Sequence, residues 1–231
     1  MKYLILGDGL LGTYIHSKTG WDFISRKKDK IDFTNIDSYI HYLQPYDQIL
    51  NCIGYTDTLD NNKLKHWDIN YVGVIDLVNI CNKLNKKIIH ISTDYIYNNS
   101  IPNASEKDIP IHYNNWYTYT KLLSDGYIQA KSKNYLLIRT SFKETPFKWN
   151  KAWLNLIGNF DYINVIGDLI IKSVRKNFNG VLNIGTNKKN MYELALKTKS
   201  NCEPINNKIS EGLYPFDISM DLNKLKLLLN D

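Results

Sequence analysis

The stretch GDGLLG, residues 7–12, follows a short apolar run and is the strongest indication of the fold in this sequence. A GxGxxG pattern after a strand and at the start of a helix is typical of a dinucleotide-binding turn. Its first glycine permits the tight turn, the second lets a pyrophosphate approach the backbone, and the third lets the helix pack closely on the strand. The free amides at the helix start favour phosphate. An ordinary glycine turn of an α/β protein is the alternative.

Short apolar runs alternate with helical stretches on the C-terminal side of that turn. We expect strands at residues 2–6, 21–25, 48–53, 87–92 and 135–139. We expect helices from about residue 11 and over residues 36–43, 68–84 and 117–130. Strands that alternate with helices imply right-handed crossovers and a parallel sheet. The fold class is therefore α/β, a Rossmann-type doubly wound parallel sheet.

The pattern changes after residue 140. Residues 143–153 are irregular and contain Pro146, Trp149 and Trp153. Later stretches predict helices at 161–174, 191–197 and 222–229 with a strand at 181–184. We expect a dinucleotide-binding domain over residues 1–140. Residues 141–231 are expected to form a small C-terminal substrate lobe together with late elements of the main sheet, so this boundary is soft.

Composition narrows the class of protein. The 231 residues are 43% hydrophobic and carry a formal charge of +6. No apolar run is long enough for a membrane span, and glycine follows the first apolar run too early for a signal peptide. The three cysteines lack metal-ligand spacing, which predicts no metal site and a reducing cytoplasm. The basic surface suits anionic ligands, but no aromatic and basic array for nucleic acid is evident.

The end of the second strand bears on the choice of cofactor. NAD sites usually place Asp or Glu there to bind the ribose 2′-hydroxyl, whereas this chain has Ser25, Arg26 and Lys27. Arg26 can pair with a 2′-phosphate, so we expect NADP (NADPH) rather than NAD. A run of surface charge is the alternative. Asp32, followed by Phe33, could contact the adenine edge or cap the next helix.

A tyrosine and a lysine four residues apart form the candidate proton-transfer pair. Tyr117 and Lys121 would share one face of a helix. A neighbouring ammonium lowers the pKa of a phenol, which would suit Tyr117 to general acid catalysis. Alone, this spacing also fits a solvated helix face. Thr93, at the end of the fourth strand, would bring a hydroxyl to the same crevice, because ligands of doubly wound sheets bind at the carboxyl ends of strands.

Several motifs in order resemble one family. They are GDGLLG at 7–12, NCIGYTD at 51–57, NYVG at 70–73, STDYIY at 92–97, YTYTK at 117–121 and IRTSF at 138–142, with further likeness at 180–198 and 217–222. The chain resembles the extended short-chain dehydrogenase/reductases, and within them the dTDP-4-dehydrorhamnose reductases and related sugar-nucleotide reductases. The resemblance implies NADPH-dependent reduction of a nucleotide-linked 4-keto-6-deoxy sugar, with a dTDP or UDP carrier.

The resemblance also implies roles for individual residues. Tyr117 would give a proton to the new alkoxide, Lys121 would hold the nicotinamide ribose, and Thr93 would bind the substrate carbonyl. The expected cofactor-binding residues are Gly7, Gly9, Leu10, Leu11, Gly12, Ser25, Arg26, Lys27, Asp32, Phe33, Cys52, Ile53, Gly54, Asn70, Ser92, Tyr117, Lys121, Arg139, Thr140 and Ser141. The expected substrate-binding residues are Tyr55, Thr56, Thr93, Asp94, Tyr95 and Tyr117. The expected partner is a nucleotide sugar, and a homodimer is left open.

Single positions distinguish the reductases from sugar-nucleotide dehydratases and epimerases. Sugar-nucleotide dehydratases follow the threonine with Asp-Glu, but here Tyr95 follows Asp94, so the base for elimination is missing. Cys52 and Cys81 do not occupy the place of an epimerising cysteine. A non-catalytic NADP-binding regulatory subunit and a sugar-nucleotide epimerase are the alternative functions.

The segment 143–161 departs from the larger reductases, which leaves the sugar open. Phe147, Trp149 and Trp153 could stack on a base or sugar, or form the core of the small lobe. Lys143, Lys148 and Lys151 could meet a diphosphate or lie in solvent.

Overall fold

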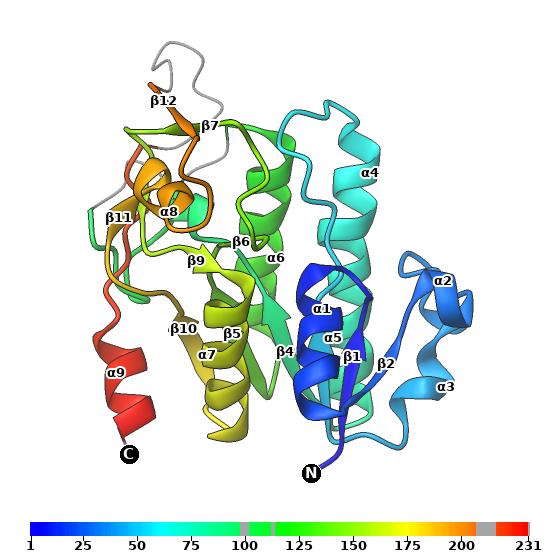
Figure 1. Ribbon diagram of the computed structural model, residues 1–231. Coiled ribbons are helices and arrows are strands. Elements are labelled where there is room, and N and C mark those ends of the chain that lie inside the picture. Colours follow the sequence, from blue (N-terminus) through cyan, green and yellow to red (C-terminus); the bar gives the residue numbers. More distant parts are fainter. Residues whose placement is uncertain (98–101, 112–113, 207–215, 231) are drawn as a thin grey trace.

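A computed structural model describes residues 1–97, 102–111, 114–206 and 216–230. Its centre is a six-stranded sheet in the order β10-β5-β4-β3-β1-β2, and every neighbouring pair is parallel (Figure 1). The strands are β1 (Tyr3–Leu6), β2 (Asp22–Ile24), β3 (Gln48–Asn51), β4 (Lys87–Ile91), β5 (Tyr135–Arg139) and β10 (Gly180–Asn183). The order changes direction at β1, which confirms the expected doubly wound sheet.

The turn after β1 depends on two glycines. Gly7 has a φ of 101°, in the left-handed region that side chains avoid. A Cβ on Gly12 would overlap the carbonyl oxygen of Gly7, so only glycine lets α1 (Leu10–Thr19) begin this close to the strand. The turn therefore has the shape that the sequence pattern predicts.

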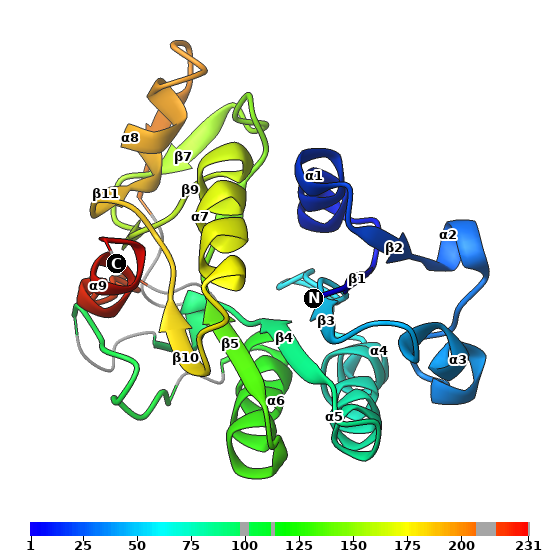
Figure 2. The same cartoon turned by 90° about the horizontal axis from the view of Figure 1, so that it is seen from below.

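Helices cover both faces of the sheet (Figure 2). On one face, α1 packs beside α7 (Ile163–Arg175) over the buried side chains of Ile5, Leu50, Ile89 and Leu136. On the other, α5 (Gly73–Lys83) and α6 (Trp116–Lys131) cover Leu4, Ile49, Ile88 and Leu137. The strands alternate between the two cores because successive side chains point to opposite faces.

Shorter elements complete the sheet edge and the crossovers. They are α2 (Arg26–Asp29), η1 (Ile36–Ser38), α3 (Ile40–Leu43), α4 (Lys63–Trp67), the π-helical η2 (Asp68–Val72) and η3 (Asp94–Tyr97). The predicted helix over 68–84 begins with η2, which joins α4 to α5. A π-helical turn of this kind often marks a functional position, and here it carries Asn70.

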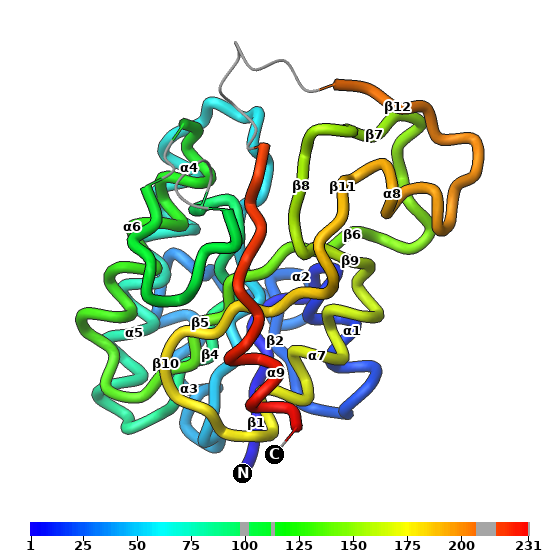
Figure 3. Tube along the Cα trace, turned by 90° about the vertical axis from the view of Figure 1, so that its left-hand side faces the viewer, coloured from blue at the N-terminus to red at the C-terminus, as the bar shows by residue number. Residues whose placement is uncertain are grey.

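A small lobe lies beyond the carboxyl ends of the strands (Figure 3). It contains β6 (Phe142–Lys143), β7 (Lys151–Trp153), β8 (Ile157–Gly158), β9 (Asp161–Tyr162), β11 (Lys189–Asn190), α8 (Met191–Leu196) and β12 (Glu203–Ile205). The pairs β7–β12, β8–β11 and β6–β9 are each two-stranded. α7, β10 and α9 (Asn223–Asn230) return to the main sheet, so segments after residue 140 serve both regions.

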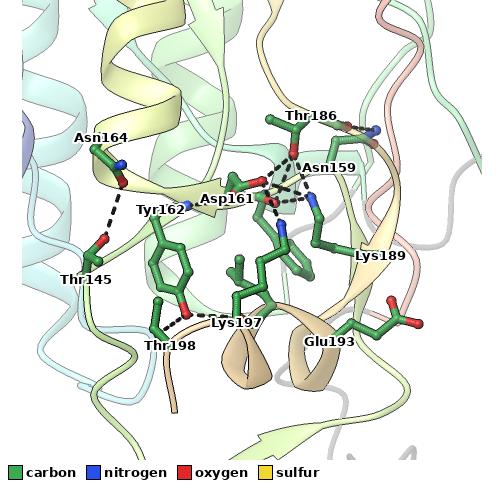
Figure 4. Close-up of polar contacts among 12 residues, drawn as sticks. Thr145, Asn159, Asp161, Tyr162, Asn164, Thr186, Lys189, Glu193, Lys197 and Thr198 are labelled. Atoms are coloured by element: carbon green, nitrogen blue, oxygen red, sulfur yellow. Dashed lines mark hydrogen bonds and ion pairs between the residues drawn. The ribbon is translucent and has the colours of Figure 1, made fainter. Parts of the chain in front are cut away.

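One buried carboxylate ties the lobe together (Figure 4). Asp161 Oδ2 accepts from Thr186 Oγ1 at 2.8 Å and lies 3.2 Å from Lys189 Nζ and 3.5 Å from Lys197 Nζ. Burial alone would raise the pKa of Asp161, but the Tyr162 amide, Thr186 and Lys189 hold it below its ordinary value. This cluster joins β9 to β11 and α8 and fixes one end of the lobe.

Candidate active site

A cavity of about 1100 Å³ lies between the sheet and the small lobe. Its floor comes from the ends of β3, β4 and β5, and its roof comes from residues 143–153 with Met191 and Ile205. This is the crevice outside the carboxyl ends of the strands, where ligands of doubly wound sheets bind. None of the described helices is long and apolar enough to cross a membrane.

The glycine turn forms one wall of this cavity. Gly9, Leu10 and Leu11 line it, and a Cβ added to Gly9 would meet no other atom within 4 Å. The backbone at Gly9 therefore faces open space at the N-terminus of α1. Gly7 and Gly12 shape the turn from behind and do not reach the cavity.

The end of β4 supplies the threonine hydroxyl. Ser92, Thr93 and Tyr95 line the cavity, and Thr93 Oγ1 accepts from the amide of Tyr95 at 3.2 Å. Asp94 is fully buried behind them, and its Oδ2 has no hydrogen-bond partner among the residues described. Burial raises the pKa of Asp94 to about 7, although Lys143 opposes the shift.

The start of α6 places Tyr117 opposite Thr93. Asn115 caps this helix, because its Oδ1 accepts from the amide of Thr118 at 2.8 Å. Tyr117 follows in the first turn and lines the same cavity as Thr93. The structure thus brings together the phenol and the hydroxyl that the sequence placed in one crevice.

The protonation of Tyr117 differs from our expectation. Burial raises its pKa to about 12, although the hydrogen bond from Thr93 lowers it in part. Lys121 does not lower this pKa as expected, because its amine points to β4 and contacts His90 and the carbonyl oxygen of Ile91. The phenol is therefore protonated at neutral pH, the form required of a proton donor.

Lys121 follows Tyr117 by one turn and lines the same cavity. Its Nζ donates to the carbonyl oxygen of Ile91 at 2.7 Å and lies 2.9 Å from His90 Nε2. Burial lowers the pKa of Lys121 to about 8, against the opposing effects of Asp125 and Cys52. Both protonation states of this amine are therefore accessible near neutral pH.

The loop after β3 is held by Asn70. Its Oδ1 accepts from the amide of Tyr55 at 2.7 Å, and its Nδ2 donates to the carbonyl oxygen of Tyr55 at 2.9 Å and to Thr120 Oγ1 at 3.3 Å. Asn70 thus connects this loop to α6. The loop residues that reach the cavity are Cys52, Ile53, Gly54, Thr56, Asp57, Thr58 and Leu59.

The basic end of β2 lies outside this cavity. Ser25 caps α2 by accepting from the amide of Lys28 at 3.1 Å, while Arg26 and Lys27 are exposed. Asp32 Oδ1 accepts from Thr34, and Phe33 is buried against Gly73. Arg26 and Lys27 are thus available to a ligand, whereas the side chains of Asp32 and Phe33 are used within the protein.

The residues at the end of β5 lie partly at the cavity and partly in the protein core. Thr140 and Ser141 line the cavity, whereas the Arg139 guanidinium is buried in a bidentate pair with Asp125, at 3.0 Å and 2.9 Å. Arg139 also donates to the hydroxyl of Tyr97. Within the described chain, Arg139 therefore joins β5 to α6 from inside the protein and does not line the cavity.

The lobe side of the cavity is aromatic and basic. Phe147 is buried in the lobe core, whereas Trp149 is 51% exposed, and their ring centroids are 5.3 Å apart. Lys143 Nζ lies 5.9 Å from the Trp149 ring centroid. Sequence reasoning had singled out this segment, but it missed Met191 and Ile205, because only the tertiary fold brings them to residues 143–153.

The arrangement can transfer a proton within the cavity. A protonated phenol, a threonine hydroxyl and an amine of lowered pKa surround one space large enough for a dinucleotide end and a sugar. Among the residues that the structure describes, no group of three or more His, Cys, Asp or Glu side chains could hold a metal ion.

Comparisons with known proteins identify the family of this chain. The family model described as the RmlD substrate binding domain matches residues 1–171. A dTDP-4-dehydrorhamnose reductase of Mycolicibacterium smegmatis is 25% identical over 131 residues, which are 53% of this chain and 38% of that protein. One from Mycobacterium tuberculosis is 24% identical over 43% of this chain and 34% of that protein. The chain thus spans little more than a third of the length of these curated relatives.

Solved structures share the whole fold. The dTDP-4-dehydrorhamnose reductase of Bacillus anthracis, in complex with NADP, superposes with a TM-score of 0.84 at 20% identity and covers 98% of this chain and 92% of that one. A UDP-rhamnose synthase of Acanthamoeba polyphaga mimivirus gives a TM-score of 0.79 at 16% identity, with 100% and 94% covered. At these identities the likeness establishes the fold alone.

Proposed function

Since the chain belongs to the family of the RmlD substrate binding domain, we propose that it is an oxidoreductase that reduces a nucleotide-linked 4-keto-6-deoxy sugar with NADPH. The observation that carries this proposal is the meeting of Thr93, Tyr117 and Lys121 at one cavity, which the glycine turn also lines. The names of the relatives support the sugar-nucleotide class, with dTDP or UDP as carrier.

Each side chain has a defined task in this function. Tyr117 gives its proton to the oxygen of the former ketone, and Thr93 orients that oxygen by a hydrogen bond. Lys121 holds a ribose hydroxyl of the cofactor and supplies positive charge beside the reaction. When bound, the nicotinamide supplies the hydride, so the protein contributes position, charge and the proton.

The residues present fit NADP at both ends of the expected site. The open backbone at Gly9 and the N-terminus of α1 suit a pyrophosphate. The exposed Arg26 and Lys27 suit a 2′-phosphate. The complex of the Bacillus anthracis protein with NADP supports this choice.

Turnover tests the proposal directly. When the protein is mixed with NADPH and a dTDP- or UDP-linked 4-keto-6-deoxyhexose, NADPH should be oxidised and the absorbance of the reduced nicotinamide should fall. Tyr117→Phe should lose at least about a hundredfold in kcat, since a positioned proton donor contributes on this scale. Tyr119→Phe is the matched control, because Tyr119 lies on the same helix and stacks edge-on against Trp116 outside the cavity.

Other outcomes would replace the proposal. Cofactor binding without turnover of any sugar nucleotide would indicate a regulatory NADP-binding subunit. Release of a tightly held NAD on denaturation, with interconversion of sugar epimers, would indicate an epimerase. Undiminished turnover in Tyr117→Phe would remove the assigned proton donor.

A further inference from the structure

A buried polar chain runs from β3 through β4 to Lys121. Asn51 and His90 are register partners on the two strands, and both are fully buried. Asn51 Nδ2 lies 3.1 Å from His90 Nδ1, and His90 Nε2 lies 2.9 Å from Lys121 Nζ. The ring of His90 thus contacts the amine of the candidate active site.

The backbone fixes the direction of this chain. The amide of Ile53 can only donate, and it lies 3.0 Å from Asn51 Oδ1, so that atom is the amide oxygen. The NH2 group of Asn51 therefore faces His90 and donates to Nδ1. A neutral imidazole has one acceptor and one donor nitrogen, so the ring proton of His90 is on Nε2.

That proton points at Lys121 Nζ. An ammonium has only donors, and it would place N–H against N–H at this contact. A neutral amine has a lone pair that accepts from Nε2–H, and it keeps an N–H for the carbonyl oxygen of Ile91. The contacts on the β4 side of Lys121 therefore match the amine better than the ammonium.

We propose that His90, held in its Nε2–H tautomer by Asn51, is a positioning residue that donates a hydrogen bond to Lys121 and stabilises the neutral amine during the proton cycle. This inference rests on the proposed function. After Tyr117 has protonated the alkoxide, water in the cavity relays one proton from the Lys121 ammonium to the phenolate, and the amine that remains accepts from His90. Water in the cavity then restores the ammonium, so each turnover moves one solvent proton to the product.

The surrounding charges are consistent with this cycle. Lys121 faces Cys52 from the end of β3, His90 from β4 and Asp125 from α6. Asp125 favours the ammonium, but its carboxylate is paired with Arg139. Burial and the charge of Lys121 hold the pKa of His90 well below its usual range, so the ring stays neutral while Lys121 titrates.

Histidine 15N NMR of the full chain, with and without NADPH, tests the tautomer without any need for turnover. The His90 resonances are assigned by their loss in His90→Phe. We expect a proton on Nε2 and a bare Nδ1, and a proton on Nδ1 would overturn the proposal. This result is independent of the substrate, so failure of the proposed function would not be mistaken for failure of this inference.

The pH profile of kcat provides the kinetic test. If His90 donates to the amine, His90→Leu removes a contact that favours neutral Lys121. Lys121 then loses its proton at higher pH, and the corresponding limb of the pH profile of kcat moves to higher pH. A ring that only accepts from the ammonium predicts a move to lower pH, and a filler residue predicts no move. Either of these outcomes overturns the proposal.

Two further variants test the hydrogen-bond donor at position 90 and the tautomer that Asn51 sets, by the same pH profile. His90→Gln retains an N–H donor and should move the limb back toward that of the unmodified protein. Asn51→Asp should shift the ring proton to Nδ1 and move the limb to higher pH, and absence of that shift counts against the relay. His16→Gln is the control, since His16 lies on α1 and its ring hydrogen-bonds the carbonyl oxygen of Trp21.

Discussion

Gly12 lies against the carbonyl oxygen of Gly7, with no room between them for a side-chain atom. Gly12→Ala would therefore force α1 away from β1. We expect it to lower the free energy of unfolding by about 1–3 kcal/mol, the usual cost of overpacking. Urea unfolding followed by circular dichroism measures this, and a variant as stable as the unmodified protein would contradict the close packing.

Gly9 provides the matched comparison. It has a φ of −70° and faces open space, so Gly9→Ala meets neither strain nor a clash. Stability should fall by less than about 1 kcal/mol, the scale of a poorer helix cap. The Kd for NADPH should nevertheless rise about tenfold or more, because the methyl group occupies the expected path of the pyrophosphate. Equal NADPH affinity in fluorescence titration would place the phosphates elsewhere.

Arg26 and Lys28 separate the two explanations of the basic turn after β2. Arg26 is exposed, whereas Lys28 lies over the ring of Phe23 with its Nζ 4.4 Å from the centroid. Arg26→Ala should lower kcat/KM for NADPH about tenfold, the scale of one charge-assisted hydrogen bond, and leave that for NADH unchanged. Lys28→Ala should alter neither value. Equal losses with both cofactors would remove the 2′-phosphate assignment.

The sequence predicted the parts of this structure that depend on local pattern. The glycine turn, the parallel strands and the juxtaposition of Thr93 with Tyr117 followed from apolar periodicity and from the rule that strand ends meet at one edge. Arg139 was predicted to bind the cofactor but is buried away from the cavity, and only its pairing with the buried Asp125 on α6 explains why its guanidinium points inward. The contact of His90 with Lys121 depends on side-chain directions across two strands and a helix, which no spacing in the sequence encodes.

The Arg139–Asp125 pair allows a test of this buried charge. Both side chains are 1% exposed, so Arg139→Met leaves a carboxylate without its cation in the core. We expect a loss of about 3–5 kcal/mol in the free energy of unfolding. The double variant Arg139→Met, Asp125→Leu removes both charges and should recover most of that loss. Urea unfolding of Arg139→Met, Asp125→Leu and the double variant completes the cycle, and additive losses would show that the two groups act independently.

The titration of Asp94 should make the free energy of unfolding depend on pH. Burial raises its pKa from 3.8 to about 7, so between these values the folded state holds a proton that the unfolded state has lost. The free energy of unfolding must then fall as pH rises through this window, by an amount on the order of a few kcal/mol. Asp94→Asn removes this dependence, because an amide does not titrate.

The comparison is the stability of Asp94→Asn minus that of the unmodified protein, measured by urea unfolding at several pH values. The difference should grow in favour of the variant from about pH 4 to about pH 7 and become constant above it, once the folded state has also lost the proton. Asp37→Asn, on the exposed turn η1, should give a small difference at every pH. A difference for Asp94→Asn that stays flat would show that this carboxyl is ionised in the folded protein throughout the range, and Lys143 would then be the group that compensates its charge.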